Sequence, residues 1–289
     1  LQSQFRSSYA VFCLKKKRRG GGDLATGIVH RLFRAGYQVL ILETAEPAAI
    51  RRQVSFCEAV YEGTATVEGV TAERIYTAKK QAVEEVLQRG RIPLLVDPDG
   101  RSIEVLKPDV VVDAIIAKKN LGTYKEMAPL VIGIGPGFVA GEDVHLVVES
   151  MRGHNLARIF TTGSALPNTG IPGNIGGFTK ERVLHAEAAG YMKNIRQIGD
   201  IVEKGEEIAR IYEKMTEDGT FSGSYVSVEA SISGMIRGLI REGYHFQKGF
   251  KIADIDPRES ELANCFTISD KARSIGGSVL EAVCGYVNG

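Results

Sequence analysis

The sequence predicts an α/β protein in which a doubly wound parallel sheet is followed by a small all-β domain and a C-terminal helix. Two patterns lead to this prediction. Continuous apolar runs alternate with amphipathic helical segments over the first half of the chain, as in sheets covered by helices on both faces. Short strands broken by glycines follow a Gly/Pro/Asn/Ser-rich stretch, Thr162–Gly177, which indicates a domain boundary. The expected domains are residues 1–176, 177–257 and 258–289.

The composition is that of a globular protein and disfavours several functional classes. The 289 residues are 44% hydrophobic and 25% charged, which allows two cores, and the formal net charge of +1 indicates neither nucleic-acid nor membrane binding. The cysteines are far apart and form no C-x-x-C pair; they are Cys13, Cys57, Cys265 and Cys284. This spacing argues against a metal site and favours a reducing compartment. We therefore expect a cytoplasmic protein without a bound metal.

A glycine loop, Arg19–Gly27, runs directly into the first amphipathic helix. Its spacing fits G-x-G-x-x-A, in which small residues let a phosphate approach backbone N–H groups at a helix N-terminus. The apolar strand Tyr37–Glu43 follows and ends in an acid 18 residues after Ala25, where a dinucleotide site would hold a ribose hydroxyl. This order predicts a Rossmann-like cofactor site, with a purely structural glycine turn as the alternative. The candidate cofactor-binding residues are Gly20, Gly22, Asp23, Ala25 and Glu43.

The segment before this loop is unusual for a first strand. The basic run Lys15–Arg19 separates the apolar residues Val11–Leu14 from Gly20, and five cations cannot lie in the core of a parallel sheet without large desolvation costs. Either the strand is Tyr9–Leu14 with a basic extension, or the first 18 or so residues are not native to this fold. We expect Leu1–Leu14 to be weakly ordered.

The following segments continue the alternation of helices and strands. The pattern predicts a helical stretch over Ala48–Tyr61, a hairpin over Thr64–Ile75, a helix over Ala78–Gln88, and buried strands at Ile92–Asp97 and Asp109–Ile116. In the first of these, Arg51 and Arg52 are either a solvated face or a phosphate clamp. Polar residues after the last strand are candidate ligand contacts, with a solvated loop as the alternative; they are Asp113, Lys118, Lys119, Asn120 and Thr123.

A second strand-to-glycine turn occurs at Leu130–Phe138, where Gly135 and Gly137 would let a ligand approach the backbone. The densest polar group of the chain follows it, and we take its members as candidate catalytic residues: Asp143, His145, Arg152 and His154. Asp143 and His145 share one face of an extended segment. Cys265 is a further candidate, because it lies just before a predicted helix that could stabilise a thiolate. A structural role is the alternative for each of them.

An internal repeat lies beyond the predicted boundary. Residues 186–211 align without gaps on residues 230–255 at a constant offset of 44, with identical glycines at 190/234, 199/243 and 205/249. The halves resemble the biotinyl/lipoyl-like barrel-sandwich family, whose G-D-x-V-x-x-G-x-x-I pattern is matched at Gly199–Ile208. The modified lysine of carrier proteins has no counterpart at a tight tip, since Lys214 lies in a longer polar segment. We therefore expect an unmodified all-β barrel-sandwich.

The end of the chain predicts a helix that begins after Ser269, a good N-cap residue, and ends near Cys284. Its apolar face would consist of Ile275, Val279, Leu280 and Val283.

Several stretches, taken together and in order, carry a wider resemblance: R-G-G-G-D-L-A-T-G, V-V-D-A-I-I-A-K-K-N-L-G-T, I-G-P-G-F-V-A-G-E-D-V-H, R-G-H-N-L, N-T-G-I-P-G, D-I-D-P-R and I-S-D-K-A-R-S-I-G-G. From about Arg19 to Val283 the chain resembles the YqeB-type accessory proteins of selenium-dependent molybdenum hydroxylases. The basic run at Lys15–Arg18 departs from the apolar strand of that pattern.

The resemblance implies a cytoplasmic bacterial maturation factor that handles or inserts the molybdenum cofactor. A molybdenum hydroxylase would be its client protein and a molybdopterin-type species its small-molecule partner, held between Gly22 and the cluster from Gly135 to Arg152. The residues alone leave a NAD(P)-dependent oxidoreductase as the alternative and disfavour a carrier protein, because the tip lysine is missing. No nucleic-acid or membrane partner is expected, and a homo-oligomer and a catalysed reaction are left open.

Overall fold

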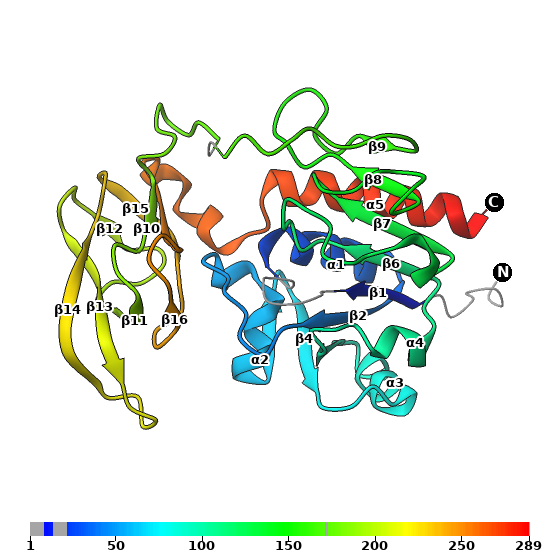
Figure 1. Ribbon diagram of the computed structural model, residues 1–289, viewed down its shortest axis with the longest axis horizontal. Helices are drawn as coiled ribbons and strands as arrows, with labels where there is room; N and C mark the ends of the chain where they lie inside the picture. Colours follow the sequence, from blue (N-terminus) through cyan, green and yellow to red (C-terminus); the bar gives the residue numbers. More distant parts are fainter. Residues whose placement is uncertain (1–8, 14–21, 171–172, 289) are drawn as a thin grey trace. The chain divides into compact units, whose positions relative to one another are not determined.

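The computed structural model describes residues 9–13, 22–170 and 173–288, and the chain forms two compact units (Figure 1). The first unit comprises Leu1–Pro47, Val54–Thr169 and Ile268–Gly289, and the second comprises Ala48–Gln53 and Gly170–Thr267. The division into three domains, residues 1–176, 177–257 and 258–289, stays a prediction. Gly20 and the basic run Lys15–Arg19 lie outside the described residues.

The first unit is built on a nine-stranded sheet with the order β3-β4-β5-β2-β1-β6-β7-β8-β9. Its strands are β1 (Tyr9–Cys13), β2 (Gln38–Glu43), β3 (Thr64–Val67), β4 (Val70–Ile75), β5 (Ile92–Val96), β6 (Val110–Asp113), β7 (Leu130–Ile134), β8 (Leu146–Val148) and β9 (Ile159–Phe160). The pairs from β4 to β8 are parallel, whereas β3 and β9 join antiparallel at the two edges. Of the two alternatives for the first strand, Tyr9–Leu14 agrees with β1.

Helices cover both faces of this sheet because successive strand residues point to opposite sides. On one face, Val39 and Ile41 of β2 share a core with α1 (Asp23–Arg34) and α5 (Asp270–Asn288). On the other, Leu40 and Leu42 share a core with α3 (Lys80–Gln88) and α4 (Ser102–Leu106). The remaining elements are short: α2 (Ala59–Glu62), η1 (Arg52–Val54), η2 (Phe56–Glu58), η3 (Lys125–Met127) and η4 (Glu259–Phe266).

The second unit consists of two four-stranded antiparallel sheets, ordered β10-β17-β15-β12 and β14-β13-β11-β16. Its strands are β10 (Val183–His185), β11 (Gly190–Asn194), β12 (Ile201–Val202), β13 (Glu207–Met215), β14 (Phe221–Glu229), β15 (Gly234–Leu239), β16 (His245–Phe246) and β17 (Lys251–Asp256). The short strand of each repeat pairs with the other repeat: β12 with β15, and β16 with β11. Neither repeat can therefore complete a sheet alone.

The backbone confirms the internal repeat. Gly190 and Gly234 each begin a strand with positive φ, at 155° and 150°. A Cβ atom at either position would collide with a backbone carbonyl oxygen, that of Tyr212 in the first repeat and that of Asp256 in the second. The same close approach thus requires glycine at equivalent places of both repeats.

The predicted fold class, a Rossmann-like doubly wound parallel sheet followed by a separate barrel-sandwich, is wrong. The sheet is mixed, with antiparallel pairs at both edges, and the β6–β7 and β7–β8 connections contain no α-helix. The second unit is two antiparallel sheets that also recruit Ala48–Gln53 from the N-terminal half. Consequently Ala48–Tyr61 is not one helix: the Ile50 carbonyl accepts a hydrogen bond from Leu239 N, at 2.8 Å, instead of a helical partner.

The C-terminal helix agrees closely with its prediction. The Ser269 hydroxyl accepts a hydrogen bond from Ala272 N at 3.2 Å, as an N-cap should, and Ile275, Val279 and Val283 are buried against the sheet. No helix of the described residues is long and apolar enough to cross a membrane.

Helix α5 packs on α1 through residues without bulky side chains. A Cβ atom on Gly27 would come within 2.6 Å of the Ala272 Cβ, and one on Gly276 within 2.8 Å of the Gly27 carbonyl oxygen. These small residues let the two backbones approach more closely than ordinary helix packing allows.

Two adjacent glycines of α5 provide a test of this contact. Gly276→Ala should lower the free energy of unfolding by about 1–3 kcal/mol, because the new methyl group overpacks the α1–α5 contact. Gly277→Ala is the matched control: no atom lies within 4 Å of its Cβ position, so the gain in helix propensity should stabilise by about 0.5–1 kcal/mol. Denaturant unfolding measures both, and equal effects of the two substitutions would contradict the packing described.

Candidate functional site

Buried acids lie at the carboxyl ends of the parallel strands, the edge at which open α/β sheets bind ligands. Glu43 ends β2, Asp113 ends β6 and Glu149 follows β8; all three are at most 1% exposed. Each accepts a hydrogen bond from a backbone N–H of the turn that follows its strand, namely Thr44, Ile115 and Met151, at 2.7–3.0 Å. These carboxylates therefore hold the turns of this edge in place.

Asp113 is the acid whose environment perturbs it most clearly at this edge. Burial raises the pKa of its carboxyl to about 6, although hydrogen bonds from the Thr123 hydroxyl, at 2.6 Å, and from Ile115 N oppose the shift. The loop after it is strained, since Ile116 and Lys118 have φ of 55° and 66°. Left-handed conformations of residues other than glycine cost of order 1–3 kcal/mol and cluster at functional sites.

Two glycines at the end of β7 allow this strained loop to pack closely against its neighbours. A Cβ on Gly137 would come within 2.5 Å of Lys119 Cα, and one on Gly135 would collide with the Ser150 hydroxyl after β8. The ends of β6, β7 and β8 are thus in direct contact. Gly135 and Gly137 lie at the carboxyl edge of the sheet, as predicted, and their missing side chains let the neighbouring loops pack closely.

Lys271, in the first turn of α5, completes the edge. Burial lowers the pKa of its ammonium group, the charge of Arg152 lowers it further, and the charges of Asp23, Glu149 and Asp270 raise it in part. Within the described part of the chain, Lys271 forms no ion pair shorter than 4 Å. Arg152 donates hydrogen bonds to both carboxylate oxygens of Asp270, each at 2.7 Å. Lys271 and Arg152 are therefore cations at the starts of α1 and α5.

The structure separates the predicted catalytic cluster. The His145 Nδ1 accepts a hydrogen bond from Val131 N at 3.0 Å, so His145 lies beside the start of β7, at the amino edge of the sheet. Gly135 follows the other end of β7, four residues and about 13 Å farther along the strand. Asp143 accepts a hydrogen bond from Val139 N at 2.9 Å within its own turn, and His154 is exposed in the turn between β8 and β9. Of this cluster, Arg152 and His154 belong to the turn that follows β8 at the carboxyl edge.

Other predicted site residues have structural surroundings. Glu43 is fully buried, and its carboxylate accepts a hydrogen bond from Thr44 N at 2.7 Å. Ala25 is buried in the core face of α1, whereas Gly22 and Asp23 begin this helix at the carboxyl edge. Cys265 is buried with its Sγ 3.7 Å from Met235 Sδ, and burial raises the pKa of its thiol, so it does not offer an accessible thiolate.

The two arginines of the predicted phosphate clamp, Arg51 and Arg52, are hydrogen-bonded to backbone carbonyls of the protein. Arg51 donates hydrogen bonds to the carbonyls of Asn264 and Thr267 at 3.0 and 3.1 Å, and Arg52 donates to that of Leu239 at 2.8 Å. Both guanidinium groups thus attach the segment 48–53 to the rest of the second unit. Among the described residues, no group of three or more His, Cys, Asp or Glu side chains could hold a metal ion.

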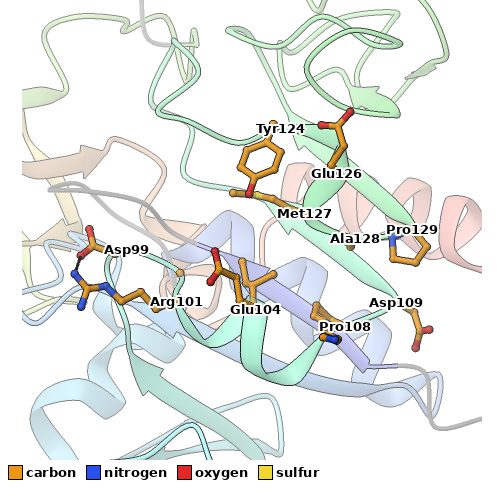
Figure 2. Close-up of a pocket in the computed structure, with 13 residues that line it drawn as sticks. Asp99, Arg101, Glu104, Pro108, Asp109, Tyr124, Glu126, Met127, Ala128 and Pro129 are labelled. Atoms are coloured by element: carbon orange, nitrogen blue, oxygen red, sulfur yellow. Dashed lines mark ion pairs between the residues drawn. The ribbon is translucent and has the colours of Figure 1, made fainter.

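A groove of about 620 Å³ lies beside α4 (Figure 2). Figure 2 shows Tyr124 and Met127 on the η3 side and Arg101 and Glu104 on the α4 side, with Arg101 3.4 Å from Asp99. Residues of the β6–β7 connection, which contains no α-helix, form one side of this groove. None of the residues singled out above as candidate catalytic or cofactor-binding groups lines it.

Lys271, Glu149 and Ser150 were missed by sequence reasoning. Two features of the sequence could have indicated a site at Lys271. It follows Ser269-Asp270 at the start of a predicted helix, and it belongs to a stretch that carries the family resemblance. Nothing in the sequence near Glu149 indicates that it lies at the carboxyl edge of the sheet, because its hydrogen-bond partners, Met151 N and Leu166 N, belong to irregular segments.

The chain is similar to a protein of Escherichia coli (strain K12) named "Uncharacterized protein YqeB". The two are 48% identical over 265 residues, which are 92% of this chain and 46% of that protein. The predicted resemblance to YqeB-type proteins is thereby confirmed, and the chain spans about half the length of this curated relative. No family model matches the chain.

Solved structures with a partial likeness include those of three other proteins. The ectoine utilization protein EutE (DoeB) of Ruegeria pomeroyi has a TM-score of 0.23 and 13% identity, covering 80% of this chain and 61% of that one. An aspartoacylase family protein of Mesorhizobium loti has 0.27 and 11%, covering 75% and 83%. A succinylglutamate desuccinylase of a Silicibacter species has 0.26 and 12%, covering 86% and 84%. Scores this low transfer no activity to this chain.

The predicted function is corrected. The relative that carries the resemblance is named only as uncharacterized, so it supports neither the molybdenum-cofactor role nor the nicotinamide-dependent alternative. The structure also does not bring all the predicted site residues together, since Glu43 is buried and His145 lies at the opposite edge from Gly135. The molybdenum-cofactor maturation role, its NAD(P)-dependent alternative and the Rossmann-type nucleotide site are therefore set aside.

The raised pKa of Asp113 predicts a defined pH dependence. A carboxyl with a pKa of about 6 when folded and about 3.9 when unfolded binds its proton more tightly in the folded state, so its contribution to stability falls as pH rises from about 4 to about 6. Asp113→Asn should remove this loss and stabilise the protein at pH 7 by up to about 3 kcal/mol relative to its effect at pH 4. Denaturant unfolding of both proteins across this range measures the difference; a pH-independent difference would contradict the raised pKa.

Proposed function

We propose that this chain binds a small anionic ligand, with a carboxylate or phosphate group, at the carboxyl edge of the first unit. The observation that carries the proposal is Lys271, a half-buried ammonium group beside Arg152 at the starts of two helices. A lysine in such surroundings is partly desolvated and gains most from an anion brought close to it.

The cations at this edge favour an anionic ligand. The loops after β6 and β8 and the first turn of α5 contribute four cations, which are Lys118, Lys119, Arg152 and Lys271. The exposed or half-buried acids at this edge are Asp23 and Asp270 at the helix starts and Glu46 and Asp97 after β2 and β5. The buried acids Glu43, Asp113 and Glu149 direct oxygens to backbone N–H groups. Three separate elements therefore offer cations to an anion that approaches this edge.

The start of α1 adds a second favourable term. The first turn of α1 lacks a side-chain cap and presents backbone N–H groups with a partial positive charge. Gly22 is the N-cap of α1 and supplies no side-chain cap, and no atom of the described residues lies within 4 Å of its Cβ position. A carboxylate or phosphate oxygen could accept hydrogen bonds there while a cation neutralises the remaining charge.

Replacement of Lys271 tests the site. Lys271→Met should weaken binding of inorganic phosphate or succinate roughly ten- to hundredfold, the loss of one charge-assisted hydrogen bond. Binding to the wild type should also weaken as pH rises through the lowered lysine pKa. Isothermal titration calorimetry measures both effects.

Lys80→Met is the matched control for that experiment. Lys80 is an exposed lysine of α3, 70% accessible and paired with Glu84, and its loss should leave binding unchanged. Equal loss in the two variants would indicate a general charge effect and refute the proposed site. The same conclusion follows if neither anion binds the wild type and no small anion co-purifies with it by mass spectrometry.

A side chain at Gly22 provides an independent test. Its φ of −64° and ψ of 179° suit any residue, so Gly22→Val should leave the melting temperature within about 2 °C. The added side chain would occupy the space over the start of α1 and should abolish anion binding. Unchanged affinity in this folded variant would show that the ligand does not approach α1.

A further inference from the structure

No protein group of the described residues pairs with the ammonium group of Lys271, although this lysine is half-buried. Two other half-buried lysines do have partners: Lys125 donates a hydrogen bond to the Gly141 carbonyl at 3.0 Å, and the ammonium group of Lys193 lies 3.1 Å from the Glu242 carboxylate. Lysines are rarely buried without such a partner. The position of Lys271 therefore has no explanation in a salt bridge.

The place of Lys271 in the fold disfavours its charged form further. It is the second residue of α5, a helix of 19 residues, so its charge lies at the positive end of the helix dipole. Arg152 brings a second cation to the same turn through two hydrogen bonds to Asp270, each at 2.7 Å. Burial and the charge of Arg152 lower the pKa of Lys271, although Asp23, Glu149 and Asp270 oppose the shift. The fold thus favours a neutral amine at this position.

The close packing of α5 on α1 places this amine beside the first turn of α1. A Cβ atom on Gly27 would come within 2.6 Å of the Ala272 Cβ, so Lys271, the preceding residue, lies next to the beginning of α1. The charge of Asp23, the first residue of α1, acts on the amine. A carboxylate that accepts hydrogen bonds at the start of α1, where Gly22 has no side chain, would therefore lie close to a nucleophilic nitrogen.

We propose that the amine of Lys271 forms an imine with an α-keto acid whose carboxylate is bound at the start of α1. This inference rests on the anion site proposed for the same edge and names its ligand class. In an α-keto acid the carboxylate is bonded directly to the carbonyl carbon, so a carboxylate held beside Lys271 brings that carbon to the amine. Desolvation and a neighbouring cation are the conditions under which a lysine becomes a nucleophile toward carbonyl compounds.

The covalent step needs no reactant other than the amine and the ketone. The lone pair of the nitrogen forms a bond to the carbonyl carbon, and the π electrons of the carbonyl move to its oxygen, which takes up a proton while the nitrogen loses one. The oxygen then leaves as water, and the nitrogen lone pair forms the C=N double bond. One amine and one ketone thus give one imine and one water molecule, and nothing is oxidised or reduced.

Reductive trapping of the full chain with pyruvate and sodium cyanoborohydride tests the proposal. The reductant converts an imine into a stable secondary amine, which peptide mass spectrometry locates. We expect the pyruvate-derived adduct on Lys271 and none on Lys80, an exposed lysine of α3 that is paired with Glu84. Succinate, which has carboxylates but no ketone, should form no adduct and should slow the trapping by competition. An adduct spread equally over both lysines, or none on Lys271, overturns the proposal.

Lys271→Arg provides the matched variant. The guanidinium group keeps a positive charge beside Arg152 but is not a nucleophile, because it stays protonated, so the adduct should be lost. A native circular dichroism spectrum of this variant shows that the loss is not due to unfolding. If the variant does not fold, the peptide map of the wild type still decides between Lys271 and Lys80.

The outcome for the imine can be separated from the outcome for the anion site. If the wild type binds phosphate or succinate in calorimetry and pyruvate leaves no adduct on Lys271, the imine is refuted and the anion site is supported. If neither anion binds and no adduct forms, both proposals are refuted.

Discussion

The first unit depends on the close contact of α1 with α5. Gly27 and Gly276 have no side chains, so two helices from opposite ends of the chain approach each other with their backbones nearly in contact. This contact lets Ile275, Val279 and Val283 complete the core on one face of the sheet. It also brings the start of α5 to the start of α1, and places Lys271 where the charges of Asp23 and Arg152 act on it.

The carboxyl edge of the sheet depends on hydrogen bonds from buried carboxylates to loop backbone groups. The β6–β7 and β7–β8 connections are loops, so their backbone N–H groups need partners that a helix would have supplied internally. Asp113 supplies one such partner, to Ile115 N in the β6–β7 connection. Beyond β8, Glu149 does the same for Met151 N and for Leu166 N. The acids that a sequence pattern would place in a catalytic role are thus used to hold the loops that present the cations.

The second unit shows why a repeat can be predicted more safely than a fold class. Gly190 and Gly234 are needed because a carbonyl of the neighbouring strand passes too close for a Cβ, a requirement that recurs with each copy. The fold class failed because it depends on connections. A parallel core was predicted from its apolar strands, but the β6–β7 and β7–β8 connections lack the expected helices, and residues 48–53 join the second unit through bonds to distant residues such as Leu239.

The sequence by itself determined local structure. The apolar runs of β2, β5 and β7, the N-cap Ser269 and the repeated glycines are specified by residues close to one another in the chain, where periodicity and φ preferences act. Only the tertiary structure decided which polar residues meet. His145 follows Gly135 by ten residues yet lies at the other edge of the sheet, whereas Arg152 meets Asp270, 118 residues away. A strand separates its two ends by its full length, and packing between distant helices brings remote residues together.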